Sequence, residues 1–477
     1  MKYETVIGLE VHVQLDTNTK IFCGCSTEFG APANTHTCPV CLGMPGSLPV
    51  LNEKFLKHSI RVALAIDCTV ANFIKFDRKH YFYPDLPKAY QISQYDKPLA
   101  SNGHLNINAN GKTKKIRILR AHMEEDAGKL IHTPTASLVD YNRTGTPLLE
   151  IVSEPDLSSS DETYDYLTKL KNILEYLEVS DCDMEKGSLR CDANISIRPI
   201  GQKELGTKAE LKNMNSFKGV RDALNYEIKR QEKQLDSGNS IIQETRLWDE
   251  TKQKTFSMRT KEEAHDYRYF PEPDLVPFTI DTLTIENIRK DLPELPQAKK
   301  VRLVSEYSLS EYDAAVISSD KHLSLYFEQA AKQYNNPKHI CNWLMGEIMN
   351  YLNTNNIEAK KLKDLLPAKK LTDMLELIDK NTISGKIGKK ILPEIISTGK
   401  DASIIIKEQN LGQISNTAKL ESIIDQVIAE NSNVVEEFKS GKDKAIMFLV
   451  GQVMQKTRGK ANPRMVNTMI KERISST

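Results

Sequence analysis

The spacing of apolar residues changes once along this chain, near residue 295, and that change most constrains its fold. Before it, segments such as 5–15 alternate polar and apolar residues, the period of a strand with one buried face. Two proline-rich stretches, 270–277 and 292–296, close this half. Beyond them apolar residues recur at helical spacing, as in 360–378 and 420–438. We therefore expect an α+β protein with a strand-rich N-terminal half followed by helices.

Two segments of the first half carry stronger local signals. Residues 104–119 form two alternating runs around Asn110-Gly111, a dipeptide typical of a tight β-hairpin. Residues 161–177 place their apolar side chains on one face of a helix, and we expect Asp161 to cap it.

Domain organisation follows from these patterns. The chain has 477 residues, enough for two to four domains. One boundary is expected near residue 295 and a second near 410, where the polar segment 408–412 interrupts the helical pattern. The predicted domains are 1–295, rich in strands; 296–410, helical; and 411–477, a small helical tail.

Charge and cysteine content narrow the class of protein. Lys and Arg number 65 against 64 Asp and Glu, which excludes a uniformly basic nucleic-acid coat protein but allows a local basic face. The N-terminus lacks the apolar core of a signal peptide, and no apolar run reaches the roughly 18 residues that span a bilayer. We expect a cytoplasmic protein with no membrane partner, whose eight cysteines are thiols or metal ligands rather than disulfides.

Four cysteines lie in two close pairs: Cys23, Cys25, Cys38 and Cys41. Two tight turns can gather four thiolates around tetrahedral zinc, and four protein ligands leave no open position, so such a zinc is structural. Two alternatives remain: unrelated buried thiols, or His36 in place of one cysteine. The scattered cysteines are expected to fill core space; they are Cys68, Cys182, Cys191 and Cys341.

The first strand presents a polar face suited to a cation. Glu10, His12 and Gln14 share that face, and a carboxylate and an imidazole two residues apart are about 7 Å apart along a strand, within reach of one ion. A solvated outer face is the alternative. Similar side chains recur on later segments. Acids occupy 124–126, and Glu150 and Glu154 stand inside an apolar run. Two further segments alternate, with Ser188, Arg190, Asp192, Asn194 and Ser196 on one face of 187–197 and Glu210, Lys212 and Met214 on one face of 209–215.

Hard oxygen ligands of this kind suit magnesium that carries a nucleotide, with basic groups nearby for the phosphates. Arg78, Lys79 and Tyr81 are candidates for that second role, although an ordinary surface cluster would look the same. The chain has no Walker A loop, Rossmann fingerprint, zincin helix or Gly-rich serine nucleophile motif, so a self-contained amidase is not expected.

Positive charge is concentrated at the C-terminal end. Residues 431–477 contain nine Lys or Arg against four Asp or Glu, including the basic segment 456–464. Such a module is suited to the phosphate backbone of RNA, and a solvated basic face is the alternative.

Eight blocks of the sequence are long and specific: 4–13, 75–94, 122–129 and 266–274, continued by 187–194, 208–217, 342–347 and 459–463. These blocks closely resemble the B subunit of glutamyl/aspartyl-tRNA amidotransferase, and the resemblance covers essentially the whole chain. It implies a cradle-shaped kinase domain, a helical domain and a tRNA-binding tail that recognises RNA by shape and backbone.

The resemblance also implies the reaction and its participants. The family phosphorylates the side-chain carboxylate of misacylated Glu-tRNA(Gln), Asp-tRNA(Asn) or both with ATP, and ammonia then replaces the phosphate. Ammonia comes from a glutaminase (A) subunit, and a small C subunit completes a heterotrimer. A noncatalytic, zinc-stabilised tRNA-binding scaffold and a magnesium-dependent nuclease or phosphatase are the rival functions.

Site residues are carried over from the family position by position. The implied magnesium ligands, and catalytic residues, are Glu10, His12, Glu125 and Glu150. The implied lining for ATP and the aminoacyl end is Lys79, Tyr81, Arg190, Asp192, Asn194 and Glu210. All four cysteines of the family's variable zinc site are retained: Cys23, Cys25, Cys38 and Cys41.

Overall fold

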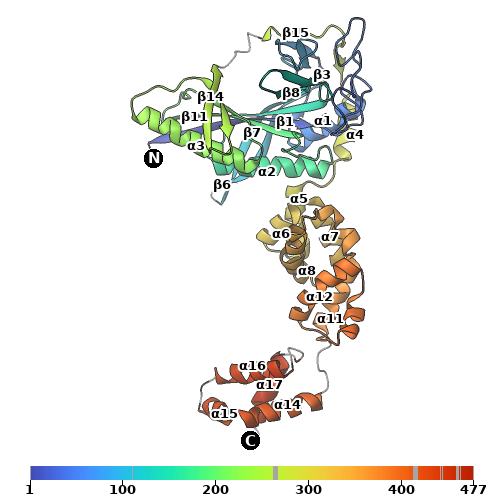
Figure 1. Ribbon diagram of the computed structural model, residues 1–477, viewed down its shortest axis with the longest axis vertical. Coiled ribbons are helices and arrows are strands. Elements are labelled where there is room, and N and C mark those ends of the chain that lie inside the picture. The colour runs from blue at the N-terminus through green and yellow to red at the C-terminus, as the bar shows by residue number, and fades with distance from the viewer. Residues whose placement is uncertain are drawn as a thin grey trace. The chain divides into compact units, whose positions relative to one another are not determined.

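The computed structural model describes residues 2–109, 111–260, 267–411, 417–440, 442, 444–457, 461 and 463–475. It divides into two compact units, Met1–Pro296 and Gln297–Thr477 (Figure 1). A search of the described helices for one long and apolar enough to cross a membrane finds none. The N-terminal unit carries the strands and the second unit is helical, which confirms the expected α+β class.

A nine-stranded sheet forms the frame of the first unit's described part, in the order β14-β13-β12-β11-β1-β10-β7-β6-β2. Its neighbours are antiparallel except β12 and β13. The bounds are β1 Tyr3–Gln14, β2 Thr69–Val70, β6 Ala100–Ala109, β7 Lys112–Glu125, β10 Pro147–Ser153, β11 Leu189–Pro199, β12 Ala209–Lys212, β13 Glu244–Asp249 and β14 Lys254–Thr260.

Smaller elements surround this sheet. A three-stranded sheet has the order β15-β4-β5, and the pairs β16–β3 and β8–β9 stand apart. Their bounds are β3 Phe73–Ile74, β4 Asp77–His80, β5 Tyr90–Ser93, β8 Lys129–His132, β9 Ser137–Asp140, β15 Phe270–Pro271 and β16 Phe278–Thr279. The helices are α1 Glu53–Ala65, α2 Ser160–Leu177, α3 Phe217–Asp236 and α4 Thr282–Lys290.

Helices cover one face of the main sheet and leave the other for polar side chains. α2 packs on β6, α3 packs on β11, and the two helices contact each other (Figure 1). Leu9, Val11 and Val13 of β1 are buried in this core, as their alternation predicts. Burial of each such side chain contributes about 1.5–3 kcal/mol, which fixes the register of β1 and sends its even-numbered residues to the opposite face.

Two local expectations for this unit have different outcomes. The hairpin at 104–119 is confirmed, since β6 pairs with β7 and Leu105 lies opposite Ile116; Gly111 has a φ of +77°, while Asn110 lies outside the described residues. The predicted cap at Asp161 is wrong. Ser159 has the extended backbone of an N-cap and its hydroxyl accepts from the Glu162 N–H, so Asp161 falls inside the first turn.

The second unit has two hydrophobic clusters, one within 303–406 and one within 420–474. Its helices are α5 Pro296–Tyr307, α6 Glu311–Ser318, α7 Lys321–Ala331, α8 Pro337–Trp343, the π-helix Leu344–Ile348, α9 Met349–Thr354, the 3-10 turn Ala359–Lys361, α10 Leu362–Leu365, α11 Ala368–Asp379, α12 Gly385–Thr398, α13 Ala402–Glu408, α14 Thr417–Glu430, α15 Ser432–Lys439, α16 Ala445–Lys456 and α17 Pro463–Ser475.

Each of the two long helices predicted for this unit is divided into shorter ones. The segment 360–378 breaks before α11, because Pro367 has no N–H to donate and pushes Leu366 out of helical geometry. The segment 420–438 breaks at Asn431, which precedes α15 and makes no capping bond to it. Its side chain donates instead to the Val427 carbonyl of α14 at 2.8 Å. Of the tail's basic segment, residues 458–460 and 462 lie outside the described residues, as does Gly412 in the predicted linker.

Candidate functional site

Four adjacent strands bring one row of ionisable side chains together on the polar face. In the register of β11, β1, β10 and β7, Arg190 lies opposite His12, His12 opposite Glu150, and Glu150 opposite His122. These residues are far apart in sequence, so only the strand pairing places them side by side. Directly opposite residues on one face of a sheet are about 5 Å apart, which suits a compact site.

Two carboxylates face two imidazoles in this row. His12 Nε2 lies 3.3 Å from Glu150 Oε2 and 3.6 Å from Glu124 Oε1. His122 Nε2 lies 3.2 Å from Glu150 and 3.8 Å from Glu124. The ligand atoms of His12, Glu124 and Glu150 all lie within 4.8 Å of one another, so the three form a candidate cation site of two carboxylates and one imidazole.

In this cluster each buried charged group is stabilised by the opposite charges beside it. Burial alone raises the pKa of the Glu150 carboxyl, but His122 and His12 outweigh it and hold that pKa well below its usual range. Burial alone lowers the pKa of His122, and Glu150 and Glu124 raise it to about 9. The carboxylates therefore stay ionised in a buried setting, as a cation ligand requires.

A second group lies beside the first, two residues away along β1. The carboxylates of Glu10, Asp192 and Glu210 approach within 4.8 Å of one another. Lys212 Nζ donates to Asp192 Oδ2 at 2.5 Å and lies 3.5 Å from Glu210, while Asn194 Nδ2 donates to Glu10 at 2.9 Å. The sheet thus holds two oxygen-rich groups on one face, in adjacent rows of β1.

Glu125 does not join either group. Its carboxylate accepts from Lys88 Nζ and from the Ile92 N–H, the latter at 2.8 Å, on the side of β7 away from His12. Met123 lies two residues before Glu125, so its side chain points to the same side of β7, and it is fully buried in the core. Glu124 is the acid that shares the face of His122, and strict alternation from His122 would have found it.

Met214 is also displaced from its predicted face. The strand β12 ends at Lys212, and Asn213 adopts a φ of +67°, so the alternation stops before Met214. Its side chain is buried in the hydrophobic core instead.

Cationic and aromatic side chains near the acids complete the polar face: Lys79 of β4, Tyr81 just after it, and Arg190 of β11. Lys79 Nζ lies 4.8 Å from the ring centroid of Tyr267. Burial alone lowers the pKa of Lys79, but the charges of Glu124 and Glu150 outweigh it and leave the pKa raised, so Lys79 is cationic beside them. Burial raises the pKa of Tyr81, which keeps its hydroxyl protonated. Arg190 is held by Asp126, to whose carboxylate its Nη2 donates at 2.9 Å.

Of the ten residues predicted for ATP, magnesium and catalysis, the structure gathers seven on the polar face of the sheet: Glu10, His12, Glu150, Arg190, Asp192, Asn194 and Glu210. Lys79 and Tyr81 reach the same charges from the smaller sheet, and Glu125 lies elsewhere. Three further residues near this face were not assigned to the site from the sequence: His122, and Glu124 and Asp126 of the acidic segment 124–126.

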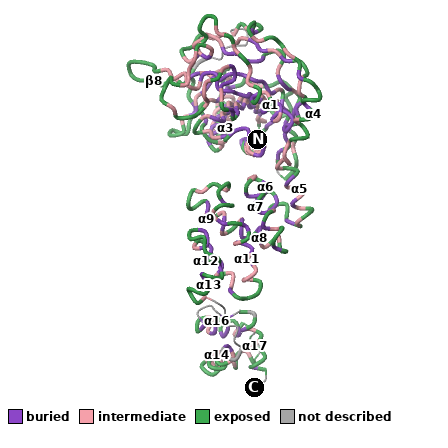
Figure 2. The backbone as a smooth tube through the Cα atoms, turned by 90° about the vertical axis from the view of Figure 1, so that its right-hand side faces the viewer, coloured by how far each residue is buried: buried purple, intermediate pink, exposed green. Residues whose placement is uncertain are grey.

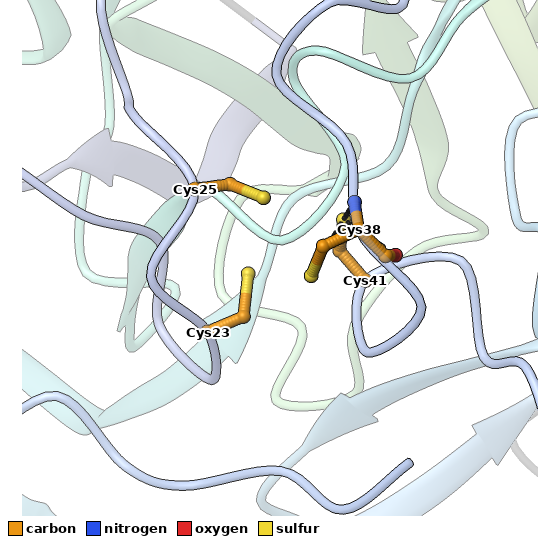
Figure 3. Close-up of side chains that lie close together, drawn as sticks. All are labelled: Cys23, Cys25, Cys38 and Cys41. Atoms are coloured by element: carbon orange, nitrogen blue, oxygen red, sulfur yellow. Dashed lines mark hydrogen bonds between the residues drawn. The ribbon is translucent and has the colours of Figure 1, made fainter. Parts of the chain in front are cut away.

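The four clustered cysteines converge from two loops (Figure 3). Their sulfur atoms all lie within 4.8 Å of one another, and Cys38 Sγ is 3.9 Å from Cys41 Sγ. The Cys38 N–H donates to Cys41 Sγ at 3.2 Å, the kind of backbone bond that supports a thiolate. His36 is not part of this group. The donor set therefore fits a four-coordinate soft metal ion.

The scattered cysteines behave as predicted. Cys68, Cys182 and Cys191 belong to the core of the N-terminal unit and Cys341 to that of the helical unit; all four are buried free thiols. They fill space between apolar neighbours.

A wide sheet with acid–imidazole pairs on one face, together with a separate group of four thiols, defines a multidomain protein with a candidate metal-dependent catalytic face. Residues 5–286 match the family model of the GatB/GatE catalytic domain, and residues 325–474 match the GatB domain. The chain therefore belongs to the GatB family, the B subunits of the tRNA-dependent amidotransferases of protein biosynthesis.

Curated relatives extend along the full chain. The B subunit of the aspartyl/glutamyl-tRNA(Asn/Gln) amidotransferase of Thermoanaerobacter sp. (strain X514) is 58% identical over 100% of both chains. Those of Carboxydothermus hydrogenoformans and Persephonella marina are 57% and 54% identical, each over 99% of both chains. The resemblance expected from the sequence blocks is confirmed.

Proposed function

We propose that this chain is the ligase subunit that activates and amidates the side chain of misacylated Glu-tRNA(Gln), Asp-tRNA(Asn) or both. A carboxylate is a poor acyl donor, so the terminal phosphorus of ATP first bonds to a side-chain oxygen and ADP leaves. Ammonia then attacks the acyl carbon, the C–O bond to phosphate breaks, and the nitrogen loses a proton. Gln-tRNA(Gln) or Asn-tRNA(Asn) is the product.

The observation that carries this proposal is the two oxygen-rich groups on one sheet face. His12, Glu124 and Glu150 would hold one magnesium ion, and Glu10, Asp192 and Glu210 would hold a second. Magnesium bound there would offset the negative charge of the ATP phosphates. The donor sets fit, since each offers two or three carboxylates and no thiol.

Cationic side chains at the margin would orient the anionic substrates. Lys212 donates to Asp192, and Lys79 lies near Glu124 and Glu150. Arg190 donates to Asp126, an acid outside both groups. Because these partners fix their positions, the three cations are ready to meet phosphate oxygens with little reorganisation. Tyr81 and Asn194 would line the same space for ATP and the aminoacyl end.

Other parts of the chain take supporting roles in the proposal. Zinc at the four thiols would fix the loops that carry Cys23 and Cys41, a structural role. Residues 1–295 would form the catalytic cradle, 296–410 a helical domain, and 411–477 the tRNA-binding tail. We place the chain in the cytoplasm, in a heterotrimer with a glutaminase (A) subunit that supplies ammonia and a small C subunit.

The decisive measurement is phosphate release from ATP that requires misacylated tRNA. We expect release in the assembled enzyme, reduced at least about 100-fold by Glu150→Gln, because a neutral amide is a poor magnesium ligand. Glu154→Gln, the same change four residues along the chain, is the matched control and should keep the wild-type rate. A noncatalytic scaffold would give no tRNA-dependent release, and a nuclease would instead cleave tRNA without ATP.

A further inference from the structure

Lys79 differs from the other cations of the polar face because no carboxylate contacts it directly. Within the part of the chain that the structure describes, its Nζ makes no hydrogen bond and no close ion pair, whereas Lys212 and Arg190 each donate to a carboxylate. Glu124 and Glu150 attract Lys79 from a greater distance. The three N–H donors of its ammonium are therefore open to an anionic substrate group.

Aromatic rings lie where a direct anionic partner of this lysine would be expected. Lys79 Nζ is 4.8 Å from the centroid of the Tyr267 ring and 5.9 Å from that of the Tyr81 ring. The two rings meet edge to face, with centroids 6.0 Å apart and planes at 70°. The face of a ring attracts an ammonium within about 6 Å. Unlike a carboxylate, a ring holds the cation without neutralising its charge.

Tyr267 stands at the start of a segment that is fastened to β4, the strand that carries Lys79. Phe270 of β15 pairs with Arg78 of β4. The Arg78 guanidinium donates to both oxygens of the buried Glu272 carboxylate, at 2.7 and 2.9 Å. Backbone pairing and a two-bond ion pair therefore fix this segment close to the strand over which the Tyr267 ring lies.

The backbone between Tyr267 and Tyr269 has an uncommon conformation. Arg268 has a φ of +46°, in the left-handed region that residues other than glycine rarely adopt. His80 Nδ1 donates to the Arg268 carbonyl at 3.2 Å, and the Tyr269 ring stacks on that of Tyr95 with centroids 4.3 Å apart. Such a conformation persists only where its surroundings impose it. The turn directs the two tyrosine rings to different neighbours.

We propose that Tyr267 is a positioning residue for phosphoryl transfer, whose ring holds the Lys79 ammonium beside the acid groups with its N–H donors open to the transferred phosphate. The inference rests on the proposed function, because that function supplies the phosphoryl group. Lys79 would donate to the phosphoryl oxygens while the bond to ADP breaks and the bond to the substrate carboxylate forms. A lysine bound to a carboxylate would first have to leave it, whereas a lysine held by a ring is already in place.

The test measures kcat and KM for ATP in tRNA-dependent phosphate release by the assembled enzyme. Tyr267→Leu should lower kcat about 10-fold and change KM less than about twofold, because the ring acts on the transferred group. Tyr267→Phe keeps the ring, so its kcat should stay within about twofold of the wild-type value. The matched control is Tyr226→Leu, at a ring of α3 that packs against Trp248 (Figure 2, where α3 is labelled). It should keep the wild-type kcat.

Fluorinated phenylalanines at position 267 separate the charge of the ring face from its shape. Each added fluorine withdraws electron density from the face while the ring stays nearly the same size, so kcat should fall stepwise from phenylalanine to the trifluorinated ring. A double-mutant cycle adds a second readout. In a Lys79→Met background, Tyr267→Leu should lower kcat little further, because both changes act on one contact.

Three outcomes would overturn the inference and leave the proposed function standing. The first is a wild-type kcat in Tyr267→Leu. The second is a low kcat in that variant with equal rates along the fluorinated series, which would mean that the ring only fills space. The third is a fully additive loss in the cycle with Lys79→Met. A wild-type enzyme that shows no tRNA-dependent phosphate release would overturn both proposals.

Discussion

Glu124 and Glu125 are neighbours in β7, yet their carboxylates lie on opposite sides of the sheet. Glu124 is within 4 Å of His12 and His122 on the polar face. Glu125 is bound to Lys88 and to the Ile92 N–H on the other. Two adjacent acids therefore hold different positions for a purely geometric reason, the two-residue period of a strand.

These positions predict different consequences for the same substitution. Glu124→Gln should lower tRNA-dependent phosphate release at least about 100-fold and raise the magnesium concentration needed for half-maximal rate, because one carboxylate leaves the ligand group. Glu125→Gln should leave that magnesium concentration unchanged. It should instead lower the free energy of unfolding by about 3 kcal/mol, since Lys88, only 6% exposed, loses its anionic partner.

Magnesium titration of phosphate release and denaturant unfolding, both on each variant, separate the two acids. A shifted magnesium dependence in Glu125→Gln with normal dependence in Glu124→Gln would exchange their roles and contradict the geometry described above.

The group of four cysteines predicts that the purified protein contains bound zinc. Protein purified without chelator should contain about one zinc per chain, and Cys23→Ser should lose it and melt several degrees lower, because a ligated ion fixes both loops. Cys341→Ser is the control: it removes a buried thiol from the helical unit, so it should lose stability while keeping its zinc. Metal analysis by mass spectrometry and thermal melting test both statements; equal zinc in the two variants would refute the site.

Signals that are local in sequence allowed the cysteine group and the polar face of β1 to be predicted. The sulfur ligands fall in two short spacings, and Glu10, His12 and Gln14 follow from one uninterrupted alternation. Glu125 rather than Glu124 was assigned to the site from the family resemblance, and β7 does not keep one alternation that would have indicated Glu124 from the start of the strand. Opposite Val152 and Ser153 its pairing skips from Arg120 to Ile118, so parity read from the start of the strand points the wrong way at its end.

The partners of those residues depend on long-range pairing. Nothing near His12 in the sequence indicates that Glu150 and Arg190 will lie on either side of it; the register of three strands decides this. The breaks in the two predicted helices, by contrast, were indicated by residues within those segments. Pro367 and Asn431 are both visible as helix-ending residues, and the periodic apolar pattern around them outweighed that signal.

Asp126 is expected to act as a positioning residue. It accepts from Arg190 at 2.9 Å and from Gln14 Nε2 at 2.8 Å, so it sets where the guanidinium lies. Asp126→Asn keeps the shape but removes the charge that holds Arg190. We expect kcat for phosphate release to fall about 10-fold with little change in magnesium dependence, because the cation is misplaced rather than lost.

Steady-state kinetics of Asp126→Asn and of Arg190→Lys test this coupling. The double variant should be no worse than about the poorer single one, since both changes act on one contact. Fully additive losses would show that Asp126 acts independently of Arg190.

His58 predicts how the N-terminal unit responds to acid. Its imidazole is buried in α1, 8% exposed, and burial with the nearby charges of Lys54 and Arg61 lowers its pKa to about 4. In the unfolded chain the pKa is about 6.5. Between these values the unfolded chain binds a proton that the folded unit refuses, so stability should fall as pH drops from about 6.5 towards 4 and then level off for this group.

His58→Gln removes that titration, so its stability should decline less than that of the wild type over the same pH range. Trp248 reports on the N-terminal unit and Trp343 on the helical one, which allows urea unfolding to be followed by Trp248 fluorescence in a Trp343→Phe background. Parallel pH curves for the two proteins would mean that His58 takes up its proton equally well in the folded state. A wild-type curve that falls more steeply shows instead that protonating His58 favours the unfolded chain, because glutamine has no proton to gain.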